Sequence, residues 1–429
     1  MNKVLHLIGI GILGTIVSLL SLQYVPIINY SITFIVSSML YLLFASLLLK
    51  YDVDKEIIFT FVVFSIVTRG AFITTTPIGS DDIYRYMWDG KVQSASINPY
   101  RFAPTAPELQ SLTSANLPHR VNHADMKTMY FPLSEWIFFL GYELSGEQVW
   151  GYKFLLLLSE CISIYGIVLI LQQLKINRKY ILLYALCPMI IYEYAVDAHV
   201  DGFGLPLLIF AIYFYIRNRK LLGLFFLGMS LSIKPVGLVL LPVLFFEEKG
   251  WRNKMAVLVV PFVILGVQFF PYMFSADPFE SLGAFAVNWT FNGFVFNILN
   301  SIMHDNQLAR TVCAVILLIV VLALSMTKKP LLDRLYYAVL FLLLLSPIVH
   351  PWYVGWLAVM LPVVRKWSGL VFVSTLCLTS FTYISYQLNG QWKEEPIQWL
   401  VEYIPVVILM LLELGNRTRM FFPERPFEQ

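Results

Sequence analysis

The chain has 429 residues, of which 58% are hydrophobic and 13% are charged, and its mean hydropathy is +0.71. Soluble domains carry about 25% charged residues, so this composition excludes an ordinary soluble protein and indicates a polytopic membrane protein. The formal net charge of +3 gives no sign of nucleic-acid binding. The four cysteines lie in apolar runs without the spacing of a metal site or a disulfide framework.

Apolar segments of spanning length recur along the whole chain. A spanning helix needs about twenty apolar residues. The candidates are roughly 4–22, 28–49, 56–74, 150–174, 180–196, 203–217, 254–274, 308–326, 333–347, 351–364, 368–386 and 397–414. The first is long for a signal peptide and has no small-residue cleavage site after it, so we expect a retained helix. We predict an all-α fold with about 12–14 transmembrane helices, forming one domain over residues 1–429 without a separate soluble C-terminal domain.

The basic residues between these segments predict the orientation. With the N-terminus inside, nearly all the basic clusters fall on the cytoplasmic side, as the positive-inside rule requires. The clusters include 50–55, 175–179, 217–220 and 249–254. We therefore expect a cell-membrane protein with both termini cytoplasmic. The polar loop at about 75–132, which we expect to contain short helices, then lies outside, as do the turns at 197–201, 288–293 and 350–353.

Two segments break this pattern. Residues 221–246 are too short to cross twice as full helices, although both flanks are basic. We expect a pair of broken helices, the first ended by Pro235, with Lys234 near the outer half of the membrane. Residues 131–144 follow the polar loop, and we expect them to lie along the interface or to re-enter the membrane.

The polar loop holds Asp81, Asp82, Arg85, Asp89 and Arg101 in an otherwise apolar chain. Paired carboxylates beside arginines and aromatic rings can perform acid–base chemistry on a charged, ring-shaped substrate. The alternative is that an aspartate only caps the helix expected at 83–93. Arg101 is as easily structural as phosphate-binding.

Further polar residues occupy the turns expected on the same side. One helix is expected to end and the next to begin at Glu193, Asp197, His199 and Asp201. These residues are either functional or form a local Asp–His hydrogen bond that closes a helical hairpin. Helical spacing argues against a metal site there. Lys234 needs an anion, from a protein carboxylate or a lipid phosphate. We predict one pocket at the outer rim of the membrane, suited to a lipid-linked phosphate sugar.

The motif Ser80–Gly90, followed by Asn98–Tyr100 and Tyr130–Pro132, resembles the first outer loop of the GT-C superfamily of integral membrane glycosyltransferases. The likeness is strongest to bacterial polyprenyl-phosphate-mannose-dependent mannosyltransferases. Supporting matches follow at His199–Gly202, Ser232–Pro235, Trp289–Asn292 and Ser346–Tyr353. Two apolar segments precede the helix before the loop, whereas many relatives begin with that helix.

The resemblance implies inverting transfer of a sugar, mannose favoured, from a polyprenyl-phosphate donor to a lipid, glycan or other envelope acceptor on the outer face. Asp82 best matches the position of the general base, and Asp81 is the second choice. Donor-phosphate contacts are expected from Arg85, Lys234, His350 and Arg101. The remaining substrate-pocket candidates are Tyr84, Trp88, Asp89, Asn98, Tyr100, His123, Tyr130, His199, Asp201, Asn292, Trp352 and Tyr353. No metal ligand is predicted and no cofactor is required, although the acidic loop leaves room for a divalent metal.

Two other functions compete with transfer. A flippase for lipid-linked sugars, or another secondary transporter, would share the helices and the buried lysine. Such proteins normally show two related halves, and no internal repeat is evident here. A non-catalytic scaffold for envelope assembly would leave the clustered Asp, Arg, Lys and His residues without a purpose.

Overall fold

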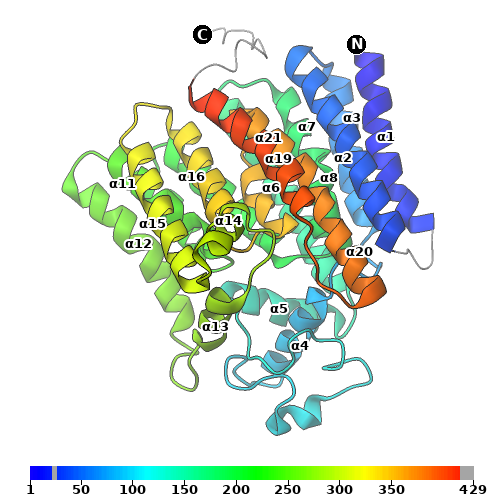
Figure 1. Ribbon diagram of the computed structural model, residues 1–429, viewed down its shortest axis with the longest axis vertical. Helices are drawn as coiled ribbons and strands as arrows, with labels where there is room; N and C mark the ends of the chain where they lie inside the picture. The colour runs from blue at the N-terminus through cyan, green and yellow to red at the C-terminus, as the bar shows by residue number, and fades with distance from the viewer. Residues whose placement is uncertain (22–26, 416–429) are drawn as a thin grey trace.

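The computed structural model describes residues 1–21 and 27–415 as a bundle of helices (Figure 1). In these residues no strand forms beyond isolated bridges from Phe291 and Asn292 to Ile348. The predicted all-α class is therefore confirmed. The cytoplasmic tail predicted after residue 415 lies outside the described residues.

The N-terminal third contains long helices. They are α1 (Asn2–Val17), which a 3-10 turn continues to Ser21, α2 (Ile27–Lys50), α3 (Lys55–Ala71) and α6 (Trp150–Gln173). The next crossing is broken into α7 (Leu182–Ala185) and α8 (Pro188–Ile190), and a π-helical turn extends α8 to Val196. The two halves meet at 52°. Pro188 has no N–H to donate to the preceding turn, so it starts a new helix instead of continuing the old one.

The middle of the chain is built from α9 (Gly204–Ile216), α10 (Lys220–Leu231), α11 (Leu240–Glu247) and α12 (Trp251–Phe269). The C-terminal part contains α13 (Glu280–Asn288), α14 (Phe294–Met303), α15 (Asn306–Ser325), α16 (Leu331–Leu345), α17 (Gly355–Ala358), α18 (Leu361–Val364), α19 (Trp367–Thr375), α20 (Ser380–Asn389) and α21 (Pro396–Leu414). Helix α2 contacts both α19 and α20, so the two ends of the described chain share one bundle.

Fewer helices span a membrane by their own length than the 12–14 predicted. Seven helices in the described residues are long and apolar enough, or eight if the bent pair at 178–196 is one span. The other predicted crossings are short or broken: α3 has 17 residues, α16 has 15, and 351–364 divides into a 3-10 turn, α17 and α18. Hydropathy detects apolar stretches, but prolines such as Pro351 and Pro362 divide them into short helices.

Residues 221–246 form the predicted broken pair, because α10 and α11 are separated by Ser232–Lys234 and a 3-10 turn, Pro235–Val239. The detail of the break differs from the prediction. Pro235 begins the second half instead of ending the first, since a proline at the first helical position loses no hydrogen bond. Lys234 is left in extended backbone between the halves.

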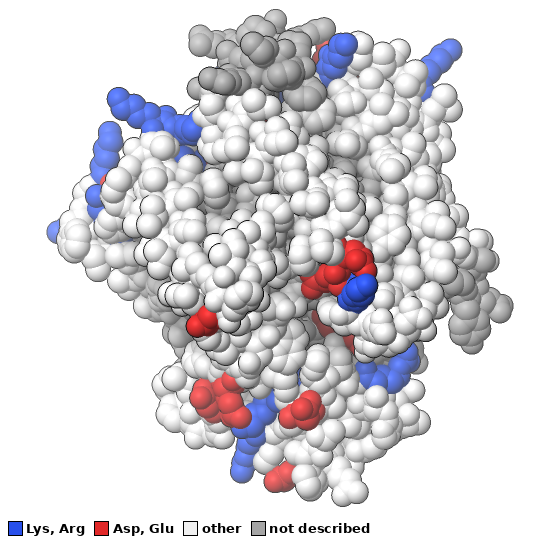
Figure 2. All heavy atoms as spheres, in the orientation of Figure 1, with Lys and Arg blue, Asp and Glu red and all other residues white. Residues whose placement is uncertain are grey.

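Helices α4 (Asp82–Ser94) and α5 (Pro132–Ser145) pack together at the end of the bundle opposite the N-terminus (Figure 1). They carry the polar loop, together with a 3-10 turn at Pro107–Leu112. In Figure 2 the Lys and Arg side chains at the N-terminal end show few acidic ones beside them, whereas toward the loop Asp and Glu are mixed with Lys and Arg. The segment predicted to lie at the interface is thus α5, which packs on α4 and α6.

Asp197 ties the start of this loop to the bundle. Its Oδ1 accepts hydrogen bonds from the backbone N–H groups of Ile78 and Gly79, both at 2.8 Å, and its Oδ2 accepts one from the Tyr30 hydroxyl at 2.5 Å. Tyr30 belongs to α2 and is 1% exposed. A buried carboxylate with three donors therefore links three distant parts of the chain.

Tyr30→Phe removes one donor to this buried carboxylate. We expect it to lower the free energy of unfolding by about 1.5–3 kcal/mol, because hydrogen bonds to charged groups are stronger than neutral ones. Tyr41→Phe on the same helix is the matched control, since the Tyr41 hydroxyl donates to the uncharged Leu183 carbonyl at 2.5 Å. Thermal unfolding in detergent measures both variants, and an equal or larger loss for Tyr41→Phe would contradict the assigned role of Asp197.

Candidate active site

The two loop aspartates stand at the first turn of α4. The Asp82 N–H donates to Ser80 Oγ at 3.2 Å, and the Tyr84 N–H donates to the Asp81 carbonyl at 3.0 Å. The Asp81 side chain, at the N-cap, makes no capping hydrogen bond. Both carboxylates instead accept from the Asn122 amide, whose Nδ2 lies 2.9 Å from Asp81 Oδ1 and 2.8 Å from Asp82 Oδ1. The alternative that an aspartate side chain only caps α4 is therefore wrong.

The two carboxylates are close enough to influence each other. Partial burial and the negative charge of Asp82 raise the pKa of Asp81, while the bond from Asn122 and the nearby His123 act in the opposite direction. Asp81 is exposed and Asp82 is half-buried. Solvent and a bound molecule can therefore reach this pair from the loop side.

Lys234 is paired with Asp201. Its Nζ lies 3.0 and 3.1 Å from the two Asp201 oxygens and 3.2 Å from the centre of the Tyr353 ring. Asp201 also accepts a hydrogen bond from Trp356 Nε1 at 2.7 Å. The Lys234 side chain is 23% exposed, whereas Asp201 is fully buried. The anion that Lys234 needs is thus a protein carboxylate, and part of the lysine side chain stays exposed.

A stack of rings lies beside this ion pair. His199 stacks on Trp352 at 3.6 Å, Trp352 on His350 at 4.2 Å, and His350 on Phe291 at 4.5 Å between ring centres. His199 Nδ1 lies 3.0 Å from the Glu193 carbonyl and 3.1 Å from its carboxylate, so it donates to an acceptor group. The hairpin is thus closed by a Glu–His bond, not by the Asp–His bond considered from sequence. Within the described residues, His199 Nε2 and His350 Nδ1 have no hydrogen-bond partner.

Asp82 lies close enough to interact electrostatically with His199, Lys234 and Tyr353. The hydroxyl of Tyr86 on α4 also accepts a hydrogen bond from the Val200 N–H at 3.4 Å. The loop aspartates and the turns at 199–201, 234 and 350–353 therefore converge at one end of the bundle, as the predicted pocket requires.

Arg85 and Asp89 form an ion pair inside the loop. Arg85 Nε lies 2.9 and 3.0 Å from the Asp89 oxygens, and its Nη1 donates to the Met126 carbonyl at 3.0 Å, while Nη2 has no partner in the described residues. Burial raises the pKa of Asp89, although Arg85 acts against it. Burial and the nearby Asp89 raise the pKa of Glu135, on α5, well above its usual value. This cluster packs α4 on α5.

Several other pocket candidates hold the loop together. Asn98 Nδ2 donates to the Tyr272 carbonyl and to Ser275 Oγ, and the Tyr100 hydroxyl donates to the Tyr130 carbonyl. Tyr130 packs edge-on against Tyr86. These contacts position the loop on the end of α12.

Others lie at the edges of the convergent cluster. Arg101 is exposed with its guanidinium over Phe102, His123 packs against Trp289, and Tyr84 lies under the Arg120 guanidinium at 3.8 Å. Trp88 is fully buried in α4. Asn292 Nδ2 donates to Glu402 at 2.7 Å, which ties the 291–293 turn to α21.

Sequence reasoning gave no role to Asn122, Glu135 or Tyr30. Asn122 stands forty residues from Asp82 along the chain, and only the folded loop brings them together. Glu135 is an acid in a largely apolar segment, which is the one signal in the sequence that could have found it. Among the described residues no group of three or more His, Cys, Asp or Glu is arranged around a metal position.

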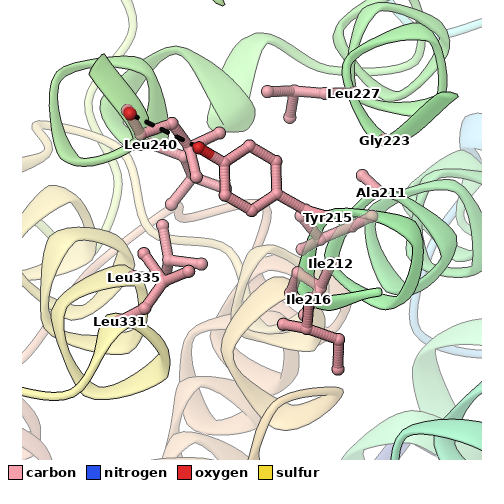
Figure 3. Close-up of a pocket in the computed structure, with 11 residues that line it drawn as sticks. Ala211, Ile212, Tyr215, Ile216, Gly223, Leu227, Leu240, Leu331 and Leu335 are labelled. Atoms are coloured by element: carbon pink, nitrogen blue, oxygen red, sulfur yellow. Dashed lines mark hydrogen bonds between the residues drawn. The ribbon is translucent and has the colours of Figure 1, made fainter. Parts of the chain in front are cut away.

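A separate apolar pocket opens at the other end of the molecule. Figure 3 shows Tyr215 between the Leu residues of α10, α11 and α16, with its hydroxyl donating to the Leu244 carbonyl at 3.5 Å. The residues that line it carry no charged group. It lies beside the basic turns at 217–220 and 249–254, far from the aspartates, and is no candidate for the chemistry.

Comparison with known proteins gives one family. The family model described as alpha-(1->6)-mannopyranosyltransferase, N-terminal domain, matches residues 12–247, more than half of the chain. The matched region holds Asp81, Asp82, Asp201 and Lys234. The match begins inside α1, so it takes in the last residues of that helix and all of α2.

No match was found among curated proteins, and none among solved structures. The family model alone covers enough of the chain to decide membership, and the convergent polar residues agree with it. The chain therefore belongs to the alpha-(1->6)-mannopyranosyltransferase family, whose members are polyprenyl-phosphate-mannose-dependent GT-C glycosyltransferases.

Proposed function

We propose that this protein transfers mannose, with inversion, from a polyprenyl-phosphate donor to a lipid, glycan or other envelope acceptor at the extracytoplasmic face. The observation that carries the proposal is the approach of a half-buried carboxylate, Asp82, to Lys234, whose side chain is partly exposed. The family membership supports transfer over the flippase or transporter alternative.

Asp82 is the proposed general base. The acceptor oxygen attacks the anomeric carbon as the bond from that carbon to the phosphate oxygen breaks. The acceptor proton passes to Asp82, and the electron pair of the broken bond stays on the phosphate. A positioned base contributes about 10²–10⁴-fold to such a step.

Lys234 and two further groups that can donate hydrogen bonds, from His350 and Arg85, are the proposed contacts of the donor phosphate. Lys234 presents its ammonium beside Tyr353, and His350 has a ring nitrogen without a partner in the described residues. Arg85 Nη2 also lacks a hydrogen-bond partner within the described part of the chain. Fixed positive charge stabilises the dianion that departs. The proposal makes no use of Arg101, which is exposed over Phe102.

The proposed orientation follows from the charges. At the end with the N-terminus Lys and Arg stand with few acidic side chains, whereas at the end with α4 and α5 both signs are mixed (Figure 2). The positive-inside rule then favours a cytoplasmic N-terminal end and an extracytoplasmic loop.

Asp82→Asn keeps the size of the side chain and removes its basicity. With purified protein, polyprenyl-phosphate-mannose and membrane-lipid extract as acceptor, we expect kcat to fall about 10²–10⁴-fold. Asp81→Asn is expected to lose less. Asp125→Asn, an exposed site in the same loop, is the control. Full activity of Asp82→Asn would refute the base assignment.

Cysteine labelling tests the orientation. Ser111→Cys places a thiol on the exposed loop, and Met326→Cys places one at the opposite end, where Met326 is 67% exposed. In intact cells a membrane-impermeant maleimide is expected to label only the first, and both after permeabilisation. The unsubstituted protein gives the background from its own thiols. The reverse pattern would place the loop inside.

Metal removal tests whether the protein's cations are sufficient. Since Lys234 and its neighbours supply positive charge for the leaving phosphate, we expect activity to survive EDTA within about twofold. A loss that added Mg²⁺ or Mn²⁺ restores would show that a divalent ion takes part.

A further inference from the structure

Asn122 links the two aspartates through a single nitrogen. An amide group has two N–H donors, and Nδ2 lies within hydrogen-bond distance of one oxygen from each carboxylate, at 2.9 and 2.8 Å. Each aspartate therefore receives one N–H. The described contacts leave Oδ2 of Asp82 without a hydrogen bond, so this oxygen remains for another donor.

The segment that carries Asn122 is fixed on both sides. Arg120 lies over the Tyr84 ring of α4 at 3.8 Å, Val121 is buried, and His123 packs against Trp289 at 4.9 Å. Asn122 itself is only half-buried. The amide is thus held at the carboxylates by its neighbours in the chain, and a change of its side chain alone leaves those contacts in place.

Two carboxylates that bond to the same nitrogen lie close together and repel each other when both are ionised. The usual outcome is that one pKa rises and the pair shares a proton, which makes a poorer base. Hydrogen bonds donated to the charged forms oppose this outcome. An amide suits the task because it has no proton to lose and brings no charge of its own.

We propose that Asn122 is a positioning residue of the transfer reaction, which offsets the repulsion between the Asp81 and Asp82 side chains by donating one N–H to each and turns Oδ2 of Asp82 toward the acceptor hydroxyl. This inference rests on the proposed function, because it assumes that Asp82 receives the acceptor proton. Asn122 comes from the second half of the loop. The reaction needs this residue, although its side chain contacts neither the donor nor the transferred proton.

The sign of the pH effect follows from the groups around the pair. Those that interact electrostatically with Asp81 or Asp82 are Tyr84, Tyr86, His123, Tyr130, His199, Lys234, Tyr353 and Tyr383. The bond from Asn122 lowers the pKa of Asp81, so its loss raises that pKa further. A proton taken up by Asp81 is shared with its neighbour and makes the pair a poorer base, so activity falls as the pH falls through the pKa of Asp81. Loss of Asn122 therefore moves the acid limb of the kcat/KM profile to higher pH.

A double-mutant cycle tests the proposal. We expect Asn122→Ala to lower kcat/KM at neutral pH about tenfold and to move the acid limb upward, since charge-assisted bonds are lost. In an Asp81→Asn background, where only one carboxylate is charged, the same change is expected to cost less than about threefold, because the repulsion that Asn122 offsets is gone. Asn116→Ala, at an exposed position of the same loop, is the control and is expected to leave both quantities unchanged.

Asn122→Asp provides a second variant of nearly the same size. It replaces the donors with a third carboxylate, so we expect a larger loss than for alanine and a larger shift of the acid limb. A residue that only fills space would tolerate this substitution better than alanine. Thermal unfolding of each variant shows whether the protein is folded. Asn122→Ser keeps one donor, so we expect its kcat/KM to lie between that of the wild type and that of Asn122→Ala.

The inference fails if Asn122→Ala costs the same factor in both backgrounds and the acid limb stays in place. It also fails if Asn122→Asp is as active as wild type. Failure of the proposed function would look different, because the wild-type protein would then transfer no mannose from the polyprenyl-phosphate donor under any of these conditions.

Discussion

Asp197 holds the polar loop onto the membrane helices, and the rest of the site depends on that attachment. One carboxylate accepts from α2 and from two backbone groups at the start of the loop. A buried charge is stable only when its partners satisfy it, so the loop has one favourable place to enter the bundle. From that entry α4 begins at Asp82, which brings the aspartates over the turns that carry His199 and Lys234.

The short and broken helices are the second requirement of this architecture. A membrane tolerates non-helical backbone only where protein buries it or it lines a cavity. The breaks at 186–188 and 232–234 satisfy this condition through neighbouring helices. The Leu133 N–H donates to Ser232 Oγ at 3.1 Å, and Arg69 Nη1 donates to the Ala185 carbonyl, just before the first break, at 3.0 Å. Because the helices stop early, polar residues from several of them meet at one level instead of being spread along the bundle.

The sequence was a sound guide to the residues that stand out chemically and a poor guide to those that hold them. Asp82 and Lys234 were identifiable because a charge in an apolar chain needs a reason, and the structure brings them together. The number of full spans was overestimated, because hydropathy does not show where a proline starts a new helix. Asn122 and Tyr30 were missed since an asparagine in a loop and a tyrosine in an apolar helix are common, and their partners are set only by tertiary folding. Arg85 was expected at the donor phosphate, yet most of its guanidinium is used by Asp89 and Met126.

The ion pair between Lys234 and Asp201 has a consequence for turnover. In the resting protein the ammonium already has a fixed counter-ion, so under the proposed function a lipid phosphate competes with an internal anion for the same cation. That competition weakens the hold on both the incoming donor and the spent lipid carrier. A lysine without this counter-ion would bind the doubly charged carrier more tightly than the donor and slow its dissociation. Under the proposed function, the ion pair with Asp201 forms again as the carrier dissociates.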